Sequence, residues 1–200
     1  TFRAGRDVHE ETARLVFGES AGEEARRRAK IINFSIIYGT SAFSLARELG
    51  TTTAEAQKFI DRYFAERPKV RDYLDGVVEE ARERGVSETI FGRQRQVPEL
   101  RAPDRALQQA GRRIALNNPI QGSAADIIKL AMLRAARAIE ASGLRTRMIL
   151  QVHDELVFEG PEAERAAVGP LVREAMEGAA DLTVPLTVRL GFGHNWADAK

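Results

Sequence analysis

The sequence predicts an α+β fold, in which several helices are followed by a small antiparallel sheet. Apolar residues recur at helical spacing through most of residues 7–141, and shorter alternating runs follow between 146 and 193. Glycine or proline marks most boundaries between these segments. The 200 residues, of which 44% are hydrophobic and 30% charged, suffice for one large domain or two small ones.

Acidic first turns, capping hydroxyl groups and closing glycines delimit the helices of the first half. Helices are expected over residues 7–17, 23–38, 41–49, 53–64 and 69–84. A small hairpin is expected next, with strands at 86–89 and 96–97 around Phe91-Gly92-Arg93.

The second half should contain one long helix that is interrupted near its middle. We expect it to run over 104–116 and to kink at Pro119, since proline lacks a backbone donor and crowds the preceding turn. It resumes through Ala141 and stops at Gly143. The remaining expected elements are strands at 146–152 and 156–159 around a very short turn, a helix at 161–178 and a last strand at 185–193.

The composition excludes several functional classes. Because the chain has no cysteine, it has no disulfides, thiolate nucleophiles or cysteine-ligated metals. Its longest apolar runs are far shorter than the roughly 20 residues that span a bilayer. The N-terminus shows neither an initiator methionine nor a signal-peptide pattern. We therefore expect a soluble cytoplasmic chain, without a membrane partner, that is a piece of a longer protein.

Charge is informative locally although the net charge is only +1. Six arginines stand against two acids between residues 91 and 113, and eight acids stand against two arginines between 154 and 181. A third, basic cluster occupies residues 26–30. Separate basic and acidic regions suit a protein that grips phosphates and separately holds a cation. The alternative is that the arginine clusters are solvated helix faces.

The helix expected over 23–38 presents two different faces. Its core stripe consists of Ala29, Ile32 and Ile36. Roughly opposite, along about 18 Å of the axis, lies a row spaced by four residues, here called the outward row: Arg26, Lys30, Phe34 and Tyr38. Two cations followed by two aromatic rings suit a nucleoside triphosphate, whose phosphates need cations and whose sugar and base need flat apolar surface. Alternatively, the aromatic rings pack under a neighbouring helix and the cations are solvated.

Two adjacent carboxylates, Asp154 and Glu155, follow His153 at the turn between the strands expected at 146–152 and 156–159. A turn that projects carboxylates from a rigid sheet is a platform for Mg²⁺, a hard cation that favours oxygen ligands. The alternative is that these acids are simply solvated.

Arg113, Asn117 and Gln121 also recur every four residues, so they share one face if the helix merely kinks at Pro119. Arginine, asparagine and glutamine are side chains that reach base edges and groove acceptors in nucleic acids. Alternatively, they cap the helix and bond the loop around the proline.

Three motifs, taken in order, resemble family A DNA polymerases, the bacterial DNA polymerase I group, over essentially the whole chain. The fingers-helix motif of that family resembles Arg26-x-x-x-Lys30-x-x-Asn33-Phe34-x-x-x-Tyr38-Gly39. Its palm carboxylate motif is similar to Gln151-Val152-His153-Asp154-Glu155, and the stretch between them to Asn117-x-Pro119-x-Gln121-Gly122-Ser123. The resemblance implies a helical fingers subdomain at 1–103 and a C-terminal palm portion at 104–200.

The resemblance implies template-directed DNA synthesis, in which a primer 3′-hydroxyl attacks a dNTP with the help of two Mg²⁺ ions. It assigns Asp154, with Glu155 beside it, to the metal, and gives Lys30 a catalytic role at the triphosphate. The implied nucleotide contacts are His9, Arg26, Lys30, Phe34 and Tyr38. The implied DNA contacts are Arg113, Asn117, Gln121 and His153.

One family motif, an upstream palm strand whose aspartate bridges both metal ions, has no counterpart here and by family order precedes Thr1. We therefore expect a fragment whose partners are primer–template DNA, dNTPs and the missing palm and thumb region. The rival hypotheses are a non-catalytic nucleic-acid-binding module and a divergent phosphoryl-transfer enzyme such as a nuclease. The triphosphate row argues against a nuclease, which needs no incoming nucleotide.

Overall fold

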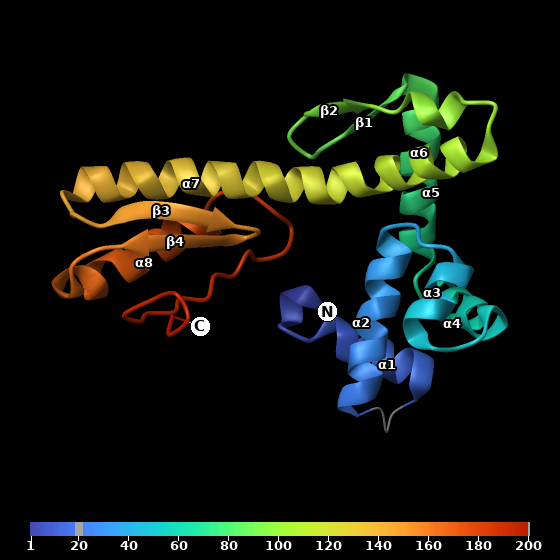
Figure 1. The fold of residues 1–200 in the computed structure, drawn as a ribbon, viewed down its shortest axis with the longest axis horizontal. Coiled ribbons are helices and arrows are strands. Elements are labelled where there is room, and N and C mark those ends of the chain that lie inside the picture. Colours follow the sequence, from blue (N-terminus) through green and yellow to red (C-terminus); the bar gives the residue numbers. More distant parts are fainter. Residues whose placement is uncertain (19–21, 200) are drawn as a thin grey trace. The chain divides into compact units, whose positions relative to one another are not determined.

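The computed structural model describes residues 1–18 and 22–199, and the chain divides into two compact units, Thr1–Ser123 and Ala124–Lys200 (Figure 1). The α+β class expected from the sequence is confirmed. The compact units meet 20 residues after the expected boundary between 103 and 104. The assignment of fingers and palm parts therefore stays a prediction.

The described part of the first unit consists of α-helices, one short hairpin, single turns of 3₁₀ and π helix, and the loops that connect them. Its helices are α1 (Val8–Phe17), α2 (Glu23–Ile37), α3 (Ala42–Leu49), α4 (Thr53–Glu66), α5 (Pro68–Arg84) and α6 (Arg105–Asn117). Strand β1 (Val86–Glu88) pairs antiparallel with β2 (Gln94–Gln96). Local signals set these limits: Thr52 and Glu55 form a reciprocal capping box at α4, and Gly85 ends α5 in the left-handed region at φ 76°.

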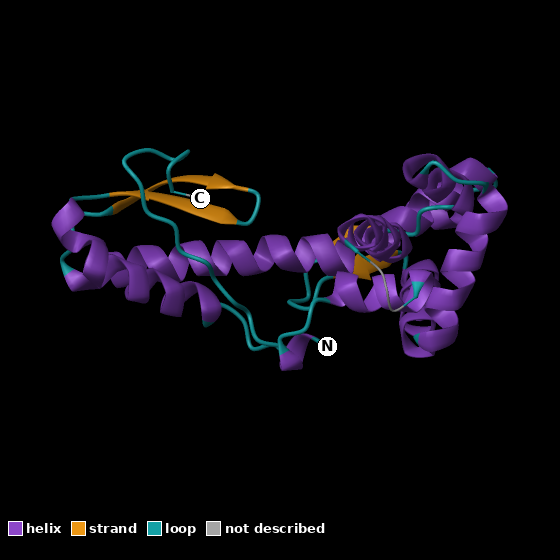
Figure 2. Cartoon of the chain, turned by 90° about the horizontal axis from the view of Figure 1, so that it is seen from below, coloured by secondary structure: helices purple, strands orange, loops and turns teal. Residues whose placement is uncertain are grey.

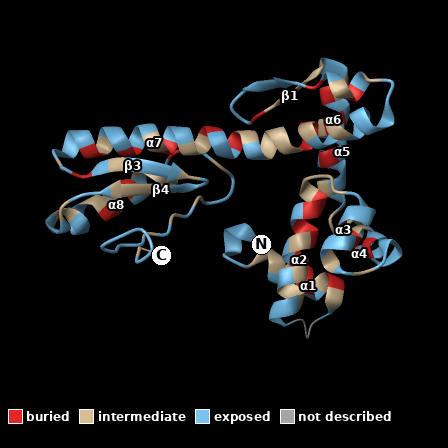
Figure 3. Ribbon diagram, in the orientation of Figure 1, coloured by how far each residue is buried: buried red, intermediate tan, exposed pale blue. Residues whose placement is uncertain are grey.

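The core of the first unit is built from side chains of several helices and of the segment after β2. Its largest fully buried members are Ile32, Leu45, Val78, Val97 and Leu116. Burying one such side chain contributes about 1.5–3 kcal/mol. The buried stripe along α2 is visible in Figure 3 and contains the three predicted core positions. Packing of this stripe leaves the outward row on the other side of the helix.

The irregularity expected at Pro119 takes the form of a wide turn, because a π-helical turn over Asn118–Gly122 joins α6 to the next helix. The turn accommodates the missing N–H of Pro119, and the Ser123 hydroxyl donates to the carbonyl oxygen of Pro119. The Asn118 side-chain amide donates to the backbone oxygen of Ser87 at 2.9 Å. The β1–β2 hairpin therefore holds this turn in place.

The second unit combines a hairpin with two helices that lie on the same side of it (Figure 2). Its elements are α7 (Ser123–Ser142, whose first residue belongs to the first unit), β3 (Arg147–Val152), β4 (Glu155–Glu159) and α8 (Arg165–Glu177). Ala131, Ala135 and Ile139 are buried along α7, and Val172 is buried on α8. Although α7 has 20 residues, no helix in the described ranges is both long and apolar enough to cross a membrane.

The prediction of a last strand over 185–193 is wrong, because among the described residues no strand pairs with this segment. Burial still alternates there, since Leu186, Val188 and Leu190 are half-buried between exposed neighbours. The backbone N–H of Val188 donates to Glu177 Oε1 at 2.9 Å and not to another strand. Alternating side chains fix which side is buried, but a strand also needs a neighbouring strand for its backbone bonds.

Candidate functional site

The outward row faces away from the core, as its spacing predicts. Phe34 is 42% exposed and Lys30 is exposed, whereas Arg26 and Tyr38 are half-buried. The rings of Phe34 and Tyr38 stack with their centroids 6.0 Å apart and their planes at 18°. The Lys30 Nζ lies 6.0 Å from the centroid of the Phe34 ring. The alternative in which Phe34 packs beneath a neighbouring helix is therefore wrong.

His9, in the first turn of α1, joins this row. Its ring centroid lies 5.8 Å from that of Phe34. The helix cap explains its position: Asp7 Oδ1 accepts the backbone N–H of His9 at 2.7 Å and that of Glu10 at 3.1 Å. By fixing the first turn of α1, the cap holds His9 beside α2.

The same carboxylate holds Arg26. Asp7 Oδ2 accepts from Nη2 of Arg26 at 2.6 Å and from its Nε at 3.2 Å. The Arg26 guanidinium lowers the pKa of Asp7 to about 2, and the backbone N–H groups of Glu10 and His9 add to that effect. The guanidinium is thereby fixed one helical turn before Lys30.

We expect Asp7→Asn to lower the melting temperature at neutral pH by no more than a few degrees, since both partners are about a third exposed. Because the folded-state pKa of Asp7 is depressed, its contribution is present above the unfolded value near 4. It is lost as pH falls toward about 2. Thermal unfolding measured from neutral to acidic pH should therefore show the difference from wild type shrinking.

Asparagine caps helices as well as aspartate does, so Asp7→Asn removes the ion pair and retains the cap. Asp7→Ala removes both and should unfold at a lower temperature than Asp7→Asn. A difference between Asp7→Asn and wild type that did not change with pH would contradict the ion-pair explanation.

The predicted carboxylate turn is present at the end of the second unit's hairpin. Val152 pairs with Glu155, so only His153 and Asp154 form the loop between the strands. His153 adopts φ 54°, a left-handed conformation that histidine tolerates better than most residues. Asp154 and Glu155 are exposed. The tight turn therefore projects an imidazole and one carboxylate, and Glu155 adds a second carboxylate from the first position of β4.

These carboxylates do not form a complete metal site by themselves. Among the described residues, no group of three or more histidine, aspartate or glutamate side chains is placed to hold an ion. Mg²⁺ keeps octahedral coordination and is usually bound through one or two carboxylates together with substrate phosphates. Asp154 and Glu155 can contribute ligands but do not enclose an ion.

The third predicted set lies along α6 and the π-helical turn, where Arg113 and Gln121 are exposed. Asn117 is half-buried, and its Oδ1 is buried without a hydrogen-bond partner among the described residues. An unpaired buried acceptor is unusual in a protein, and this one is covered by protein atoms, so the Asn117 side chain must turn outward before a ligand reaches it. Bonding of the turn around the proline falls instead to Asn118.

The sequence does not predict the contacts of two side chains, Asp7 and Asn33, that hold His9 and Arg26 in place. Asn33 is 3% exposed, and its Nδ2 lies 2.9 Å from Nδ1 of His9. A signal for it was available: Asn33 follows Ile32 on the buried side of α2, where a polar side chain requires a partner.

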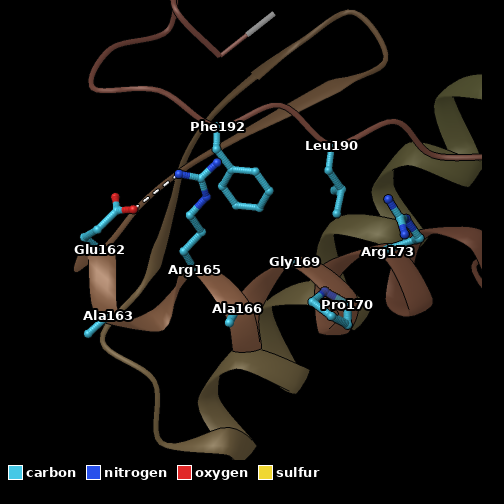
Figure 4. A pocket seen from close by; sticks show the side chains of 9 residues that line it. All are labelled: Glu162, Ala163, Arg165, Ala166, Gly169, Pro170, Arg173, Leu190 and Phe192. Atoms are coloured by element: carbon cyan, nitrogen blue, oxygen red, sulfur yellow. Dashed lines mark hydrogen bonds and ion pairs between the residues drawn. The ribbon is translucent and has the colours of Figure 1, made fainter.

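A cleft of about 490 Å³ lies in the second unit, between α8 and the C-terminal segment (Figure 4). The Arg165 guanidinium lies 4.7 Å above the Phe192 ring and pairs with Glu162 at 3.3 Å. A Cβ at Gly169 would come within 3.1 Å of Phe192, so the glycine permits this close packing. No residue of the predicted site lines the cleft.

Comparison with known proteins identifies the family. Residues 1–198 match the family described as DNA polymerase family A. The chain is 48% identical to the thermostable DNA polymerase I of Thermus aquaticus over 202 residues, which cover 100% of this chain and 24% of that protein. It is 47% identical to the DNA polymerase I of Mycobacterium tuberculosis over 198 residues, covering 98% of this chain and 22% of that one.

A solved structure, the POL domain of Pol1 from M. smegmatis in complex with DNA primer-template and dNTP, matches with a TM-score of 0.95 and 45% identity. The match covers 99% of this chain and 35% of that one. The chain spans about a quarter of the length of the curated relatives it matches. Its motifs, its fold and these matches over nearly all its residues agree, and the chain belongs to DNA polymerase family A.

Proposed function

We propose that this chain binds the incoming nucleotide and supplies catalytic groups for template-directed DNA synthesis. The observation that carries the proposal is the outward row, where two cations lead into two stacked, partly exposed rings on one side of α2. The similar M. smegmatis domain was solved in complex with DNA primer-template and dNTP, which supports the same substrate class. We expect the protein to act in the cytoplasm, at the nucleoid.

The nucleotide contacts follow from the chemistry of the row. Lys30 and Arg26 supply charge to the triphosphate, and His9 adds a phosphate contact from α1. Phe34 offers a flat apolar surface to the sugar. Tyr38, stacked on Phe34, lies toward the templating position. The ordered spacing along one helix matches the order of phosphates, sugar and base in a nucleotide.

Arg113, Asn117 and Gln121 are proposed to contact the minor-groove side of the primer–template duplex, and His153 to lie near the primer end. Minor-groove acceptors are common to all base pairs, which suits an enzyme that tests pair geometry without reading sequence. The exposure of Arg113 and Gln121 supports contact with a ligand on this side of the helix.

In the proposed reaction the primer 3′-hydroxyl loses its proton to solvent and its oxygen forms a bond to the α-phosphorus, while the bond from that phosphorus to the leaving pyrophosphate breaks. Lys30 faces the charge that develops on the leaving group and can donate a proton to it. Divalent cations neutralise phosphate charge in such reactions. Because the described residues offer only Asp154 and Glu155 at the turn, the two Mg²⁺ ions expected here require further ligands.

The isolated chain should not extend a primer when supplied with Mg²⁺, template–primer and dNTPs, since its carboxylate turn holds an ion weakly. A chimera in which this chain replaces the matching quarter of the Thermus aquaticus DNA polymerase I, here called the Thermus chimera, should extend it. Primer extension on a labelled template measures both, with the Asp154→Ala chimera as an inactive control.

Robust extension by the isolated chain would show that the assignment of the carboxylates is wrong. A folded Thermus chimera that binds DNA and never extends a primer would favour the non-catalytic nucleic-acid-binding module.

A further inference from the structure

We infer that Asn33 is a positioning residue: its side-chain amide keeps the His9 imidazole neutral with the proton on Nε2, so that His9 presents a hydrogen-bond donor on the edge facing away from Asn33. The functional meaning of this arrangement rests on the proposed contact between His9 and a phosphate. The protonation pattern itself does not.

A partly buried chain of hydrogen bonds leads from Arg67, directly after α4, to His9. Arg67, which follows α4, donates from Nη2 to Thr12 Oγ1 at 3.4 Å. Thr12 is 0% exposed and its hydroxyl donates to Asn33 Oδ1 at 3.1 Å. Asn33 Nδ2 then lies 2.9 Å from Nδ1 of His9. The bond between Thr12 and Asn33 is buried, so competition from water is small at the centre of the chain, and the bonds at its two ends are partly buried.

The direction of this chain follows from its first member. A guanidinium can only donate, so the Thr12 oxygen accepts from Arg67, and the Thr12 hydroxyl hydrogen points to Asn33 Oδ1. In this arrangement the Asn33 carbonyl oxygen faces Thr12, and its NH₂ group faces His9. Arg67 is itself held in place 4.7 Å above the ring of Tyr63.

This direction fixes the state of His9. Nδ1 can accept from an NH₂ group only if it carries no proton, so a neutral ring must carry its proton on Nε2. A charged ring would set an Nδ1–H donor against the donor of Asn33. Burial and the nearby cations also favour the neutral form of the His9 ring.

Burial is the main cause that lowers the pKa of His9, and the nearby cations Arg26 and Lys30 add to it, while Asp7 opposes them. Arg67 faces the same network from α4 through Thr12. A neutral donor suits a site whose two fixed cations already supply the charge. His9 adds direction to the phosphate contact, since its one N–H points along a defined edge of the ring.

The test replaces Asn33 by its near-isosteric acid in the full 200-residue chain. In Asn33→Asp one carboxylate oxygen still accepts from Thr12, but the other now accepts from His9 and draws a proton to Nδ1. Nitrogen-15 NMR of the histidine rings should show Nε2–H in the wild type at pH 8. In Asn33→Asp it should show protonated Nδ1, with the pKa of His9 raised by at least about 1.

His153 and His194 are internal controls in the same spectra, and their signals should not change. Should the buried carboxylate unfold the chain, Thr12→Val provides a second test, because it removes the hydroxyl that orients the amide. We expect Thr12→Val to populate both tautomers of His9. An unchanged Nε2–H signal in every folded variant would overturn the inference.

Binding of dATP to the same chain separates this inference from the proposed function. In Asn33→Asp, neutral His9 turns a lone pair toward the phosphate, and Nε2–H returns only when the ring is protonated. The affinity of Asn33→Asp relative to wild type should therefore fall about tenfold as pH rises from 6 to 9, while Asp7 and Arg26 keep their charges. If the tautomer changes but dATP leaves the His9 Nε2 signal unmoved, the positioning role stands and the phosphate contact fails.

Discussion

Lys30→Ala in the Thermus chimera should lower the maximal rate of nucleotide incorporation about 10²–10³-fold, as loss of one group acting on developing charge typically does. The leaving phosphate gains charge in the transition state, so an interaction at that point is stronger there than in the ground state. The loss should therefore appear in kcat as well as in the affinity for the nucleotide.

The structure separates Lys30 from the other cation of the row. Arg26 is held by Asp7 through two hydrogen bonds, whereas Lys30, within the described residues, makes no ion pair and lies beside the exposed Phe34 ring. A lysine on a flexible stem can follow a phosphate as the reaction proceeds, while a fixed guanidinium mainly binds. Arg26→Ala should accordingly act more on affinity than Lys30→Ala does.

Single-turnover incorporation at several dNTP concentrations separates the rate from the affinity. Lys30→Arg is the matched control, since it retains the charge and loses the compact ammonium group. Asp154→Ala should damage the rate at least as much and leave DNA binding largely intact, because it removes a carboxylate and no phosphate contact. A Lys30→Ala effect confined to DNA affinity would contradict the triphosphate assignment.

Where helical spacing alone decides which side of a helix is buried, the sequence was sufficient to predict the buried and the exposed residues. Ile32 and Ile36 lie in the core, and Lys30 and Phe34 are exposed, because 3.6 residues per turn places them on opposite sides of α2. The carboxylate hairpin could be predicted from local sequence as well. Apolar and polar residues alternate in the sequence on both sides of His153 and Asp154, which places the turn between the two strands.

What depended on distant partners could not be predicted. Thr12, Asn33 and Arg67 come from three separate segments, and only the packing of α1, α2 and α4 brings them into one hydrogen-bonded chain. Segment 185–193 has the side-chain alternation of a strand but lacks a pairing partner in the described chain. At Pro119 the sequence indicates a disturbance, but whether it becomes a break or a wide turn depends on contacts with the β1–β2 hairpin.

Phe34→Tyr should make the Thermus chimera accept dideoxynucleotides about 5- to 150-fold more readily relative to deoxynucleotides. We place the Phe34 ring against the sugar of the incoming nucleotide, where phenylalanine offers no polar atom. The 3′-hydroxyl of a normal substrate can form a hydrogen bond with its own triphosphate. A dideoxynucleotide lacks this hydroxyl, so the polar group that it would bond is left without a partner. An unsatisfied buried group costs roughly 1–3 kcal/mol, which corresponds to a discrimination of about 5- to 150-fold.

The neighbours of Phe34 make the substitution a clean one. The ring is 42% exposed and has the rings of Tyr38 and His9 as neighbours, so the added hydroxyl need not displace the core. Phe34→Tyr therefore retains the packing of the ring and adds one donor and acceptor near the sugar.

Competition between deoxy and dideoxy substrates at one template position, run on both chimeras, gives the ratio directly. Phe34→Leu is the control, since it also lacks a hydroxyl and should continue to discriminate. A ratio unchanged in Phe34→Tyr would mean that this ring does not face the sugar, and the order of contacts along α2 would then have to be reassigned.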